Sequence, residues 1–291
     1  MKIYLAKYRG FCSGVKRSIR LAEKTLERGS GQTYILNDIV HNKTVVETLR
    51  NKGLKTVTDA KEVESGTLMI SAHGIPNEII YSSQKRGLEV VDTTCPLVHK
   101  IHEAARKLAD DGYDIILFGD PGHDEVKGIV AVAPRQIHVL ASVDDVRLLP
   151  EFEKSVAFIS QSTRNVEKFH QAAEALMDRF GPMRIVNTIC RPTRTRQESA
   201  QELAGKCELV IVIGSQSSAN TRRLAEIAES GGAKARIIEN ASGLESESLE
   251  YIETVGITAG ASTPDNLVDE LVAKITDYAT ECDISLQISE L

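Results

Sequence analysis

Cysteine and aromatic residues are scarce in this chain, which has five cysteines and no tryptophan among its 291 residues. The cysteines are odd in number and far apart, so they do not suggest a disulfide framework. None belongs to a CxxC pair, which argues against a zinc ribbon or a thioredoxin-type site. Any metal bound by thiols here must therefore collect its ligands from distant parts of the chain.

Long apolar runs are absent as well. No stretch approaches the roughly 18 apolar residues of a membrane helix, and the first residues lack a signal-peptide pattern. We therefore expect a cytoplasmic protein with no membrane association. The net charge of -6 argues against nucleic-acid binding, and neither a P-loop nor a GxGxxG fingerprint is present. Nothing in the sequence determines the oligomeric state, and a monomer is compatible with it.

A unit that opens on a cysteine occurs three times. After each cysteine, apolar residues at helical spacing lead to a polar or glycine break and then to an apolar strand. The three cysteines are Cys12, Cys95 and Cys190. A polar residue follows each strand, 29, 28 and 28 residues after its cysteine: His41, His123 and Ser218. Similar helix–strand units are common by chance, but matched offsets to a polar residue are less so.

Each unit continues with a second segment of this kind, which ends in small or polar residues. Strands that alternate with helices imply parallel sheets joined by crossover connections. The chain is therefore predicted to form three similar α/β domains with mainly parallel sheets, in a pseudo-threefold arrangement around a central cavity. Their ranges are 13–95, 96–190 and 191–282, the last completed by a strand in 1–12. The tail, 283–291, has no clear role in the core.

The polar residues after the strands are the candidate binding groups. Ligands of parallel α/β sheets bind beyond the carboxyl ends of the strands, so these side chains are expected to face the cavity. They are imidazoles, hydroxyls and an amide: His41, His73, His123, Ser162, Thr163, Ser218, Asn220 and Ser262. Such groups offer many donors to phosphate oxygens. One loop histidine alone is more often an ordinary surface residue, so the interpretation rests on the matched positions.

The three repeated cysteines are candidate metal ligands. A single free cysteine is more often a small core residue. All three, however, precede a predicted helix, whose N-terminus favours the thiolate that binds metal. Three thiolates suit zinc with a histidine as the fourth ligand, or an iron–sulfur cluster with one open iron, and the cluster is preferred. Cys207 lies on an apolar stripe and is assigned to the core, while Cys282 receives no role.

Glu125 is the candidate acid. It follows His123 by two residues in a glycine-rich turn, where a carboxylate is usually exposed to solvent. Beside an anion and a metal cluster it would instead have a raised proton affinity and could relay protons. Asp124 has nothing beyond proximity to recommend it.

Seven short motifs extend these observations along nearly the whole chain. They are Arg9 to Val15, His41-Asn42, Ser71 to Gly74, Thr94 to Val98, Gly122 to Glu125, Thr188 to Cys190 and Thr258 to Ser262. Each is weak alone, but their order and spacing are highly specific. In these motifs the sequence resembles the 4-hydroxy-3-methylbut-2-enyl diphosphate reductase family of the methylerythritol phosphate route to isoprenoids.

The resemblance implies a three-domain fold around a [4Fe–4S] cluster held by Cys12, Cys95 and Cys190, with the fourth iron open to substrate. It implies an oxidoreductase that removes the hydroxyl of (E)-4-hydroxy-3-methylbut-2-enyl diphosphate and yields isopentenyl and dimethylallyl diphosphate. Reduced ferredoxin or flavodoxin is the implied electron donor, and Glu125 the implied proton donor. The positions that match the family's diphosphate-binding motifs are His41, His73, His123, Ser218, Asn220 and Ser262.

Some positions depart from the family pattern. Ser162-Thr163 stands where two threonines are common, and Ser162 is assigned the hydroxyl role near Glu125, with Thr163 as its neighbour. Ala219 replaces a frequent serine and removes one phosphate contact. Two other functions remain open: a hydro-lyase with an open-iron cluster, which needs no reductant, and a cluster-bearing sensor that binds a diphosphate without chemistry.

Overall fold

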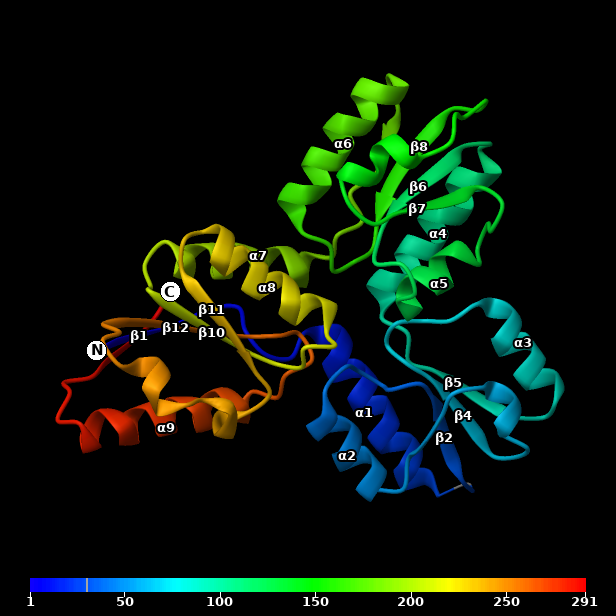
Figure 1. The fold of residues 1–291 in the computed structure, drawn as a ribbon. Helices are drawn as coiled ribbons and strands as arrows, with labels where there is room; N and C mark the ends of the chain where they lie inside the picture. Colours follow the sequence, from blue (N-terminus) through cyan, green and yellow to red (C-terminus); the bar gives the residue numbers. More distant parts are fainter. Residues whose placement is uncertain (30) are drawn as a thin grey trace. The chain divides into compact units, whose positions relative to one another are not determined.

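The computed structural model describes residues 1–29 and 31–291 and contains three separate β-sheets (Figure 1). Within these residues every strand pair is parallel. Parallel neighbours require crossover connections, which are supplied here by helices. The prediction of three α/β domains with parallel sheets is therefore confirmed.

The first sheet has the strand order β3-β2-β4-β5. Its strands are β2 (Thr33–Leu36), β3 (Lys55–Val57), β4 (Thr67–Ile70) and β5 (Glu89–Asp92). The accompanying helices are α1 (Ser13–Arg28), α2 (Lys43–Asn51) and α3 (Asn77–Lys85). The helix predicted after Cys12 is thus confirmed as α1, with Val15 and Ala22 of the predicted stripe buried.

The second sheet repeats this order as β7-β6-β8-β9. Its strands are β6 (Asp114–Phe118), β7 (Ile137–Leu140), β8 (Val156–Ser160) and β9 (Arg184–Ile185). The helices are α4 (Pro96–Asp110), α5 (Asp124–Val130) and α6 (Val166–Phe180). Proline at the first position of α4 loses no hydrogen bond and sets its φ for a helix, so the helix begins directly after Cys95.

The third sheet is larger, with the order β11-β10-β12-β1-β13. Its strands are β1 (Lys2–Leu5), β10 (Leu209–Ile213), β11 (Lys234–Ile238), β12 (Thr254–Ala259) and β13 (Gln287–Glu290). The helices are α7 (Arg191–Ala204), α8 (Ala219–Ser230) and α9 (Asn266–Glu281). The N-terminal strand completes this sheet, as predicted. The tail forms β13 beside β1, and all four residues of this strand are exposed. Leu286 and Leu291, on either side of the strand, are partly buried against the two core clusters of this sheet, so the tail has a small role in the core that the sequence did not predict.

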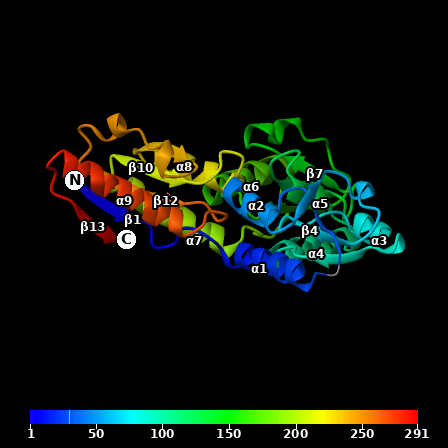
Figure 2. The same ribbon diagram turned by 90° about the horizontal axis from the view of Figure 1, so that it is seen from below.

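Strand β10 shows how one strand serves two cores. Its first, third and fifth residues pack with α9, and its second and fourth pack with α7 and α8. Successive side chains of a strand point to opposite faces, so a strand buried on both faces must be apolar throughout. The sequence Leu209-Val-Ile-Val-Ile213 meets this requirement. In Figure 1, α7 and α8 lie above the strands and α9 lies below them, and Figure 2 shows α9 across β1 and β12.

The chain divides into two compact units. The first unit comprises Met1–Cys12, His41–Lys43 and Arg191–Leu291, and the second comprises Ser13–Val40 and Thr44–Cys190. The third predicted domain with its N-terminal strand thus falls in the first unit, and most of the other two domains fall in the second. The predicted boundary between residues 95 and 96 stays a prediction.

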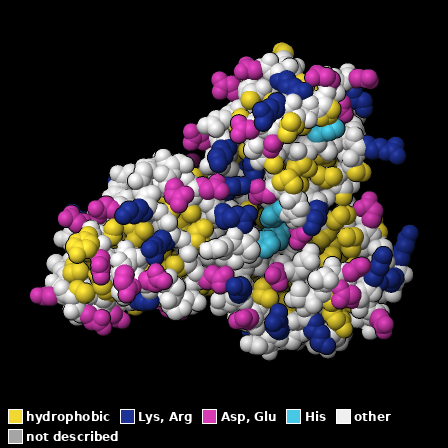
Figure 3. All heavy atoms as spheres, viewed as in Figure 1, with side chains coloured by type: hydrophobic (Ala, Val, Ile, Leu, Met, Phe, Trp, Pro, Cys, Tyr) yellow, Lys and Arg dark blue, Asp and Glu magenta, His cyan; other side chains and the backbone are white. Residues whose placement is uncertain are grey.

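Acidic and basic side chains are interspersed on the face drawn in Figure 3. Mixed charge of this kind keeps a surface hydrated without creating a large field of one sign. Among the described residues, no helix is both long and apolar enough to cross a membrane.

Candidate active site

The three repeated cysteines occupy the same place in their units. Cys12 precedes the first residue of α1, Cys95 is the N-cap of α4, and Cys190 precedes the first residue of α7. Each is half-buried and forms no disulfide bond. Each backbone N–H donates, over 3.0 to 3.1 Å, to a carbonyl just beyond the strand that pairs with the one preceding the cysteine; the acceptors are Ala261, Ala72 and Ser162. The repeat predicted from residue spacing is therefore also a repeat of hydrogen bonds.

The loops before Cys95 and Cys190 are built in the same way. Three residues before each cysteine, a side-chain oxygen accepts from the backbone N–H two residues on: Asp92 from Thr94 at 2.9 Å, and Asn187 from Ile189 at 3.1 Å. In both loops the threonine two residues before the cysteine donates its hydroxyl to a carbonyl of the neighbouring strand. These local bonds hold the thiols in place without requiring bulky side chains.

Glu125 lies buried at the start of α5, with only 2% of its surface exposed. The backbone N–H of Ser162 donates to Glu125 Oε1 at 2.7 Å, and Ser162 Oγ donates to Oε2 at 2.9 Å. Burial raises the pKa of Glu125 to about 7; the Ser162 hydrogen bonds oppose this rise, and Asp120 adds to it. A carboxyl group near half-protonation at neutral pH is suited to proton transfer. The Ser162 carbonyl in turn accepts from the Cys190 N–H.

A buried ion pair supports the loop that carries His123. Arg164 pairs with Asp120, donates to the Ala141 carbonyl at 2.6 Å and lies 3.8 Å from the ring centroid of Phe118. The Asp120 N–H also donates to Gln161 Oε1 at 2.9 Å. Sequence reasoning gave no role to Asp120 or Arg164. The position of Asp120 just beyond β6 was a usable signal, whereas nothing local distinguishes Arg164.

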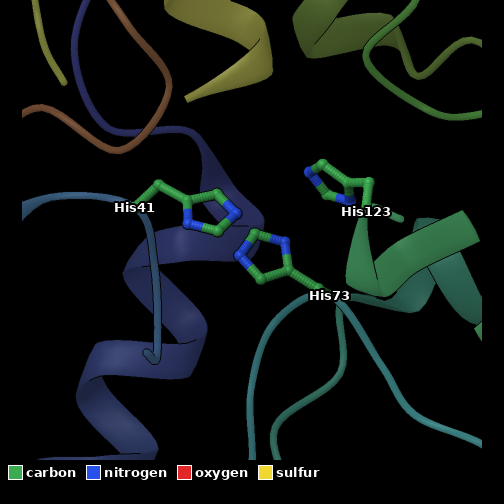
Figure 4. Close-up of side chains that lie close together, drawn as sticks. All are labelled: His41, His73 and His123. Atoms are coloured by element: carbon green, nitrogen blue, oxygen red, sulfur yellow. The ribbon is translucent and has the colours of Figure 1, made fainter. Parts of the chain in front are cut away.

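His73 and His123 lie together in the second unit. Their ring centroids are 5.5 Å apart and their planes are nearly perpendicular. His73 follows β4, and His123 caps α5 by accepting the Glu125 N–H on Nδ1 at 3.1 Å. That bond places Nδ1 as the acceptor, so the neutral ring carries its proton on Nε2. Figure 4 draws these two rings with that of His41, which belongs to the first unit.

The first unit holds the other polar candidates at the ends of β10 and β12. Ser218 caps α8, where its Oγ accepts the Thr221 N–H at 3.4 Å. Ser262 is buried and donates its hydroxyl to the His41 carbonyl at 3.2 Å. Asn220 is 4% exposed, and neither polar atom of its amide has a hydrogen-bond partner among the described residues. An amide buried in this way leaves its hydrogen-bonding capacity for a ligand.

Thr163 occupies a position that matches ligand candidates in the other repeats. The carbonyls that accept from the three cysteines belong to Ala72, Ser162 and Ala261, and the next residues are His73, Thr163 and Ser262. The buried Oγ1 of Thr163 has no hydrogen-bond partner in residues 1–29 and 31–291. Ser162 is thus bound to Glu125, as the sequence assignment requires, and the adjacent hydroxyl of Thr163 is available to a ligand.

A family model described as "LytB protein" matches residues 3–276. The chain belongs to the LytB family. Curated relatives in this family are named 4-hydroxy-3-methylbut-2-enyl diphosphate reductase. One from Geobacter sp. (strain M21) is 40% identical, over 95% of this chain and 97% of that protein. Another from Nocardia farcinica is 38% identical, over 95% of this chain and 84% of that protein.

Solved structures agree with the LytB assignment. The reductase structure from Plasmodium falciparum is 31% identical, covers 99% of this chain and 92% of its own, and has a TM-score of 0.94. A structure described as the terminal enzyme of the non-mevalonate pathway is 35% identical and has a TM-score of 0.69. The match covers 95% of this chain and 99% of that chain. The resemblance inferred from the seven motifs is therefore confirmed, as is the expectation of an oxidoreductase.

Proposed function

We propose that this chain catalyses the two-electron reductive dehydroxylation of (E)-4-hydroxy-3-methylbut-2-enyl diphosphate. The C–O bond of the allylic alcohol breaks, and the hydroxyl leaves as water with one proton. Two electrons and a second proton complete the hydrocarbon chain of isopentenyl or dimethylallyl diphosphate. We further propose that reduced ferredoxin or flavodoxin supplies the electrons.

The donor set fits an iron–sulfur cluster. Cys12, Cys95 and Cys190 are half-buried, free of disulfides and equivalent in position, and three thiolates can hold a [4Fe–4S] cluster while one iron stays open. When bound, such a cluster would supply the electrons at the reacting carbon. Zinc is the less suitable occupant, because the histidines at the strand ends are assigned to the diphosphate.

One observation carries the proposal: the buried acid and a cluster ligand share a hydrogen-bonded support. Ser162 donates twice to Glu125 and accepts from the N–H of Cys190. The acid is therefore held rigidly beside the segment that carries a thiol, and its raised pKa keeps a proton available near neutrality. A cluster protein that only binds its ligand has no need for such an acid.

The proposed diphosphate-binding groups are the polar side chains that follow the strands. They are His73, His123 and Thr163 among the residues of the second unit, and His41, Ser218, Asn220 and Ser262 among those of the first. Two observations support this proposal. The buried amide of Asn220 has no hydrogen-bond partner among the described residues, and the Ser262 hydroxyl donates a hydrogen bond to the backbone carbonyl of His41. Ser218, Asn220 and Ser262 already lie buried and the three histidines are half-buried, so these side chains lose little freedom when the anion binds, which favours affinity.

Removing the Asn220 amide tests this binding role. We expect Asn220→Ala to weaken the affinity for inorganic diphosphate about 10- to 100-fold, as the loss of hydrogen bonds to a charged group predicts. Isothermal titration calorimetry on anaerobic protein measures this change. Asn266→Ala, at the exposed start of α9, serves as the matched control. The melting temperature of Asn220→Ala should not fall, because the lost amide has no internal partner in the described residues; unchanged diphosphate affinity would contradict the role.

Anaerobic turnover tests the function as a whole. Protein matured with iron available should convert the alcohol diphosphate into both products only when reduced ferredoxin, flavodoxin or a chemical reductant is present. Conversion without a reductant would support a hydro-lyase instead. Tight binding with no conversion under reducing conditions would support a sensor.

A further inference from the structure

His102 is a buried histidine that the proposed reaction does not use. It lies on α4, two turns after Cys95, with 7% of its surface exposed. Its Nε2 atom has no hydrogen-bond partner within the described part of the chain. Burial lowers the pKa of His102 to about 4; His99 and Arg106 add to this effect, and Asp92 opposes it. The ring is therefore neutral at physiological pH, although burying an unpaired polar atom costs stability.

The His102 ring packs against two glycines from different elements. A Cβ built on Gly128 of α5 would lie 3.2 Å from Cε1 and 3.3 Å from Nε2 of His102. A Cβ built on Gly74 would lie 3.5 Å from Cε1. The two glycines are also close to each other, since a Cβ built on Gly128 would lie 3.7 Å from the carbonyl carbon of Gly74. Without side chains at these positions, the flat imidazole contacts the turn and the helix at once.

Both glycines are close in sequence to proposed diphosphate ligands. Gly74 follows His73 directly, and its φ of +75° strongly favours glycine. Gly128 lies in α5, which His123 caps and at whose start Glu125 sits. A displacement of the turn relative to α5 would therefore change the separation of the His73 and His123 rings. Rigid support of this kind matters because misplacement by about 1 Å can cost about 100-fold in rate.

We propose that His102 is a positioning residue whose imidazole holds the His73–Gly74 turn against α5 and so fixes His73 and His123 relative to each other. The expected effect of His102 on substrate binding rests on the proposed function, whereas its packing against the turn and α5 is independent of that function. Because the ring is neutral, it supports the turn without adding a charge beside the diphosphate ligands.

A cavity beside His102 makes chemical rescue possible. Its volume is about 200 Å³, and its walls come from α3, α4 and the end of α5: Ile75, Tyr81, His102, Arg106, Gly128 and Val132 are among the lining residues. Tyr81 and Arg106 are exposed, so the cavity opens to solvent. In His102→Ala, free imidazole can therefore reach the space that the side chain leaves.

The experiment compares His102→Ala with Lys107→Ala, an exposed position on the same helix. Hydrogen–deuterium exchange should rise at residues 71–75 and 124–130 in His102→Ala, return toward wild type with added imidazole, and stay unchanged in Lys107→Ala. The KM for the alcohol diphosphate should rise about 10- to 100-fold with a smaller change in kcat. Gly128→Ala, which crowds the ring from the other side, should raise exchange at residues 71–75 as well.

Exchange that stays at the wild-type level in both His102→Ala and Gly128→Ala would overturn the proposal. So would a general rise in exchange across α4 that imidazole does not reverse, because it would show a core role without specific positioning. His73→Ala separates the two claims. If it leaves the affinity for inorganic diphosphate intact, the proposed diphosphate-binding role of His73 fails, while the exchange data still decide the role of His102.

Discussion

Replacing Cys12, Cys95 or Cys190 by serine, one at a time, is expected to abolish the iron–sulfur cluster and with it all turnover. A cluster with three protein ligands cannot lose one and keep its fourth iron open for substrate, so the iron content should fall from about four per chain to near zero. Anaerobic iron and sulfide analysis with electron paramagnetic resonance measures the loss. The protein must be matured with iron available and kept from oxygen.

Cys207→Ser is the matched control for these variants. Cys207 lies in the core beside Leu203 and the backbone of Gly256, and burial raises the pKa of its thiol to about 11. A thiol that stays protonated is no metal ligand, so cluster content should be unchanged. Stoichiometric zinc in the wild-type protein, or a full cluster in any of the three other serine variants, would contradict three-thiolate iron ligation.

Changing Glu125 to glutamine is expected to lower kcat about 100- to 10,000-fold, the usual contribution of a positioned acid. Glutamine keeps the shape and can still accept the Ser162 N–H, so substrate affinity should be retained. In wild type the rate should fall as the pH rises through about 7, because Glu125 then loses the proton it donates. Product formation under steady-state reducing conditions, with calorimetry for binding, measures both effects.

Asp124→Asn provides the control for this variant. Asp124 is the adjacent carboxylate on the same helix, but it is partly exposed and contacts Asn37 and Lys127. Its turnover should stay within about twofold of wild type, the range expected of a group outside the reaction. If Glu125→Gln retained its turnover, or if Asp124→Asn lost as much, Glu125 would not be the proton donor.

Glu125→Gln should also stabilise the protein in alkaline solution. The folded-state pKa of Glu125 lies at about 7, above its ordinary value of 4.5, so the folded state holds this proton more tightly than the unfolded chain. Stability is therefore lost as the pH rises between these values, by up to about 3 kcal/mol, and does not change further above them. Glutamine has no charge to bury. The melting temperature of Glu125→Gln should exceed that of wild type at about pH 8 but not at about pH 4, and equal melting temperatures at both would show that Glu125 is not destabilised by burial.

Much of the fold and the site followed from local features of the sequence. The apolar stripes and strands that repeat after Cys12, Cys95 and Cys190 correspond to α1, α4 and α7 and the strands that follow them. Periodicity reveals these elements because burial of one face is a local requirement. The tail is the exception, since an exposed strand such as β13 has no apolar pattern to recognise.

The supporting residues could not be found in this way. Arg164 and Asp120 are 44 residues apart, and only the packed domain brings their charges together. His102 lies next to Ile101 on the buried stripe of α4, where the sequence alone does not distinguish a core histidine from a functional one. Its contacts with Gly74 and Gly128 arise from three separate elements.

The family, the three α/β units, the three thiols and the polar residues at the strand ends could all be predicted, because each is recorded in the type and spacing of neighbouring residues. How these groups are supported became visible only in the folded chain. It buried Glu125 against Ser162, left the Asn220 amide without an internal partner in the described residues, and packed a neutral imidazole onto two glycines. Burial, proton affinity and long-range packing depend on what surrounds a side chain in space, and local sequence patterns do not specify those surroundings.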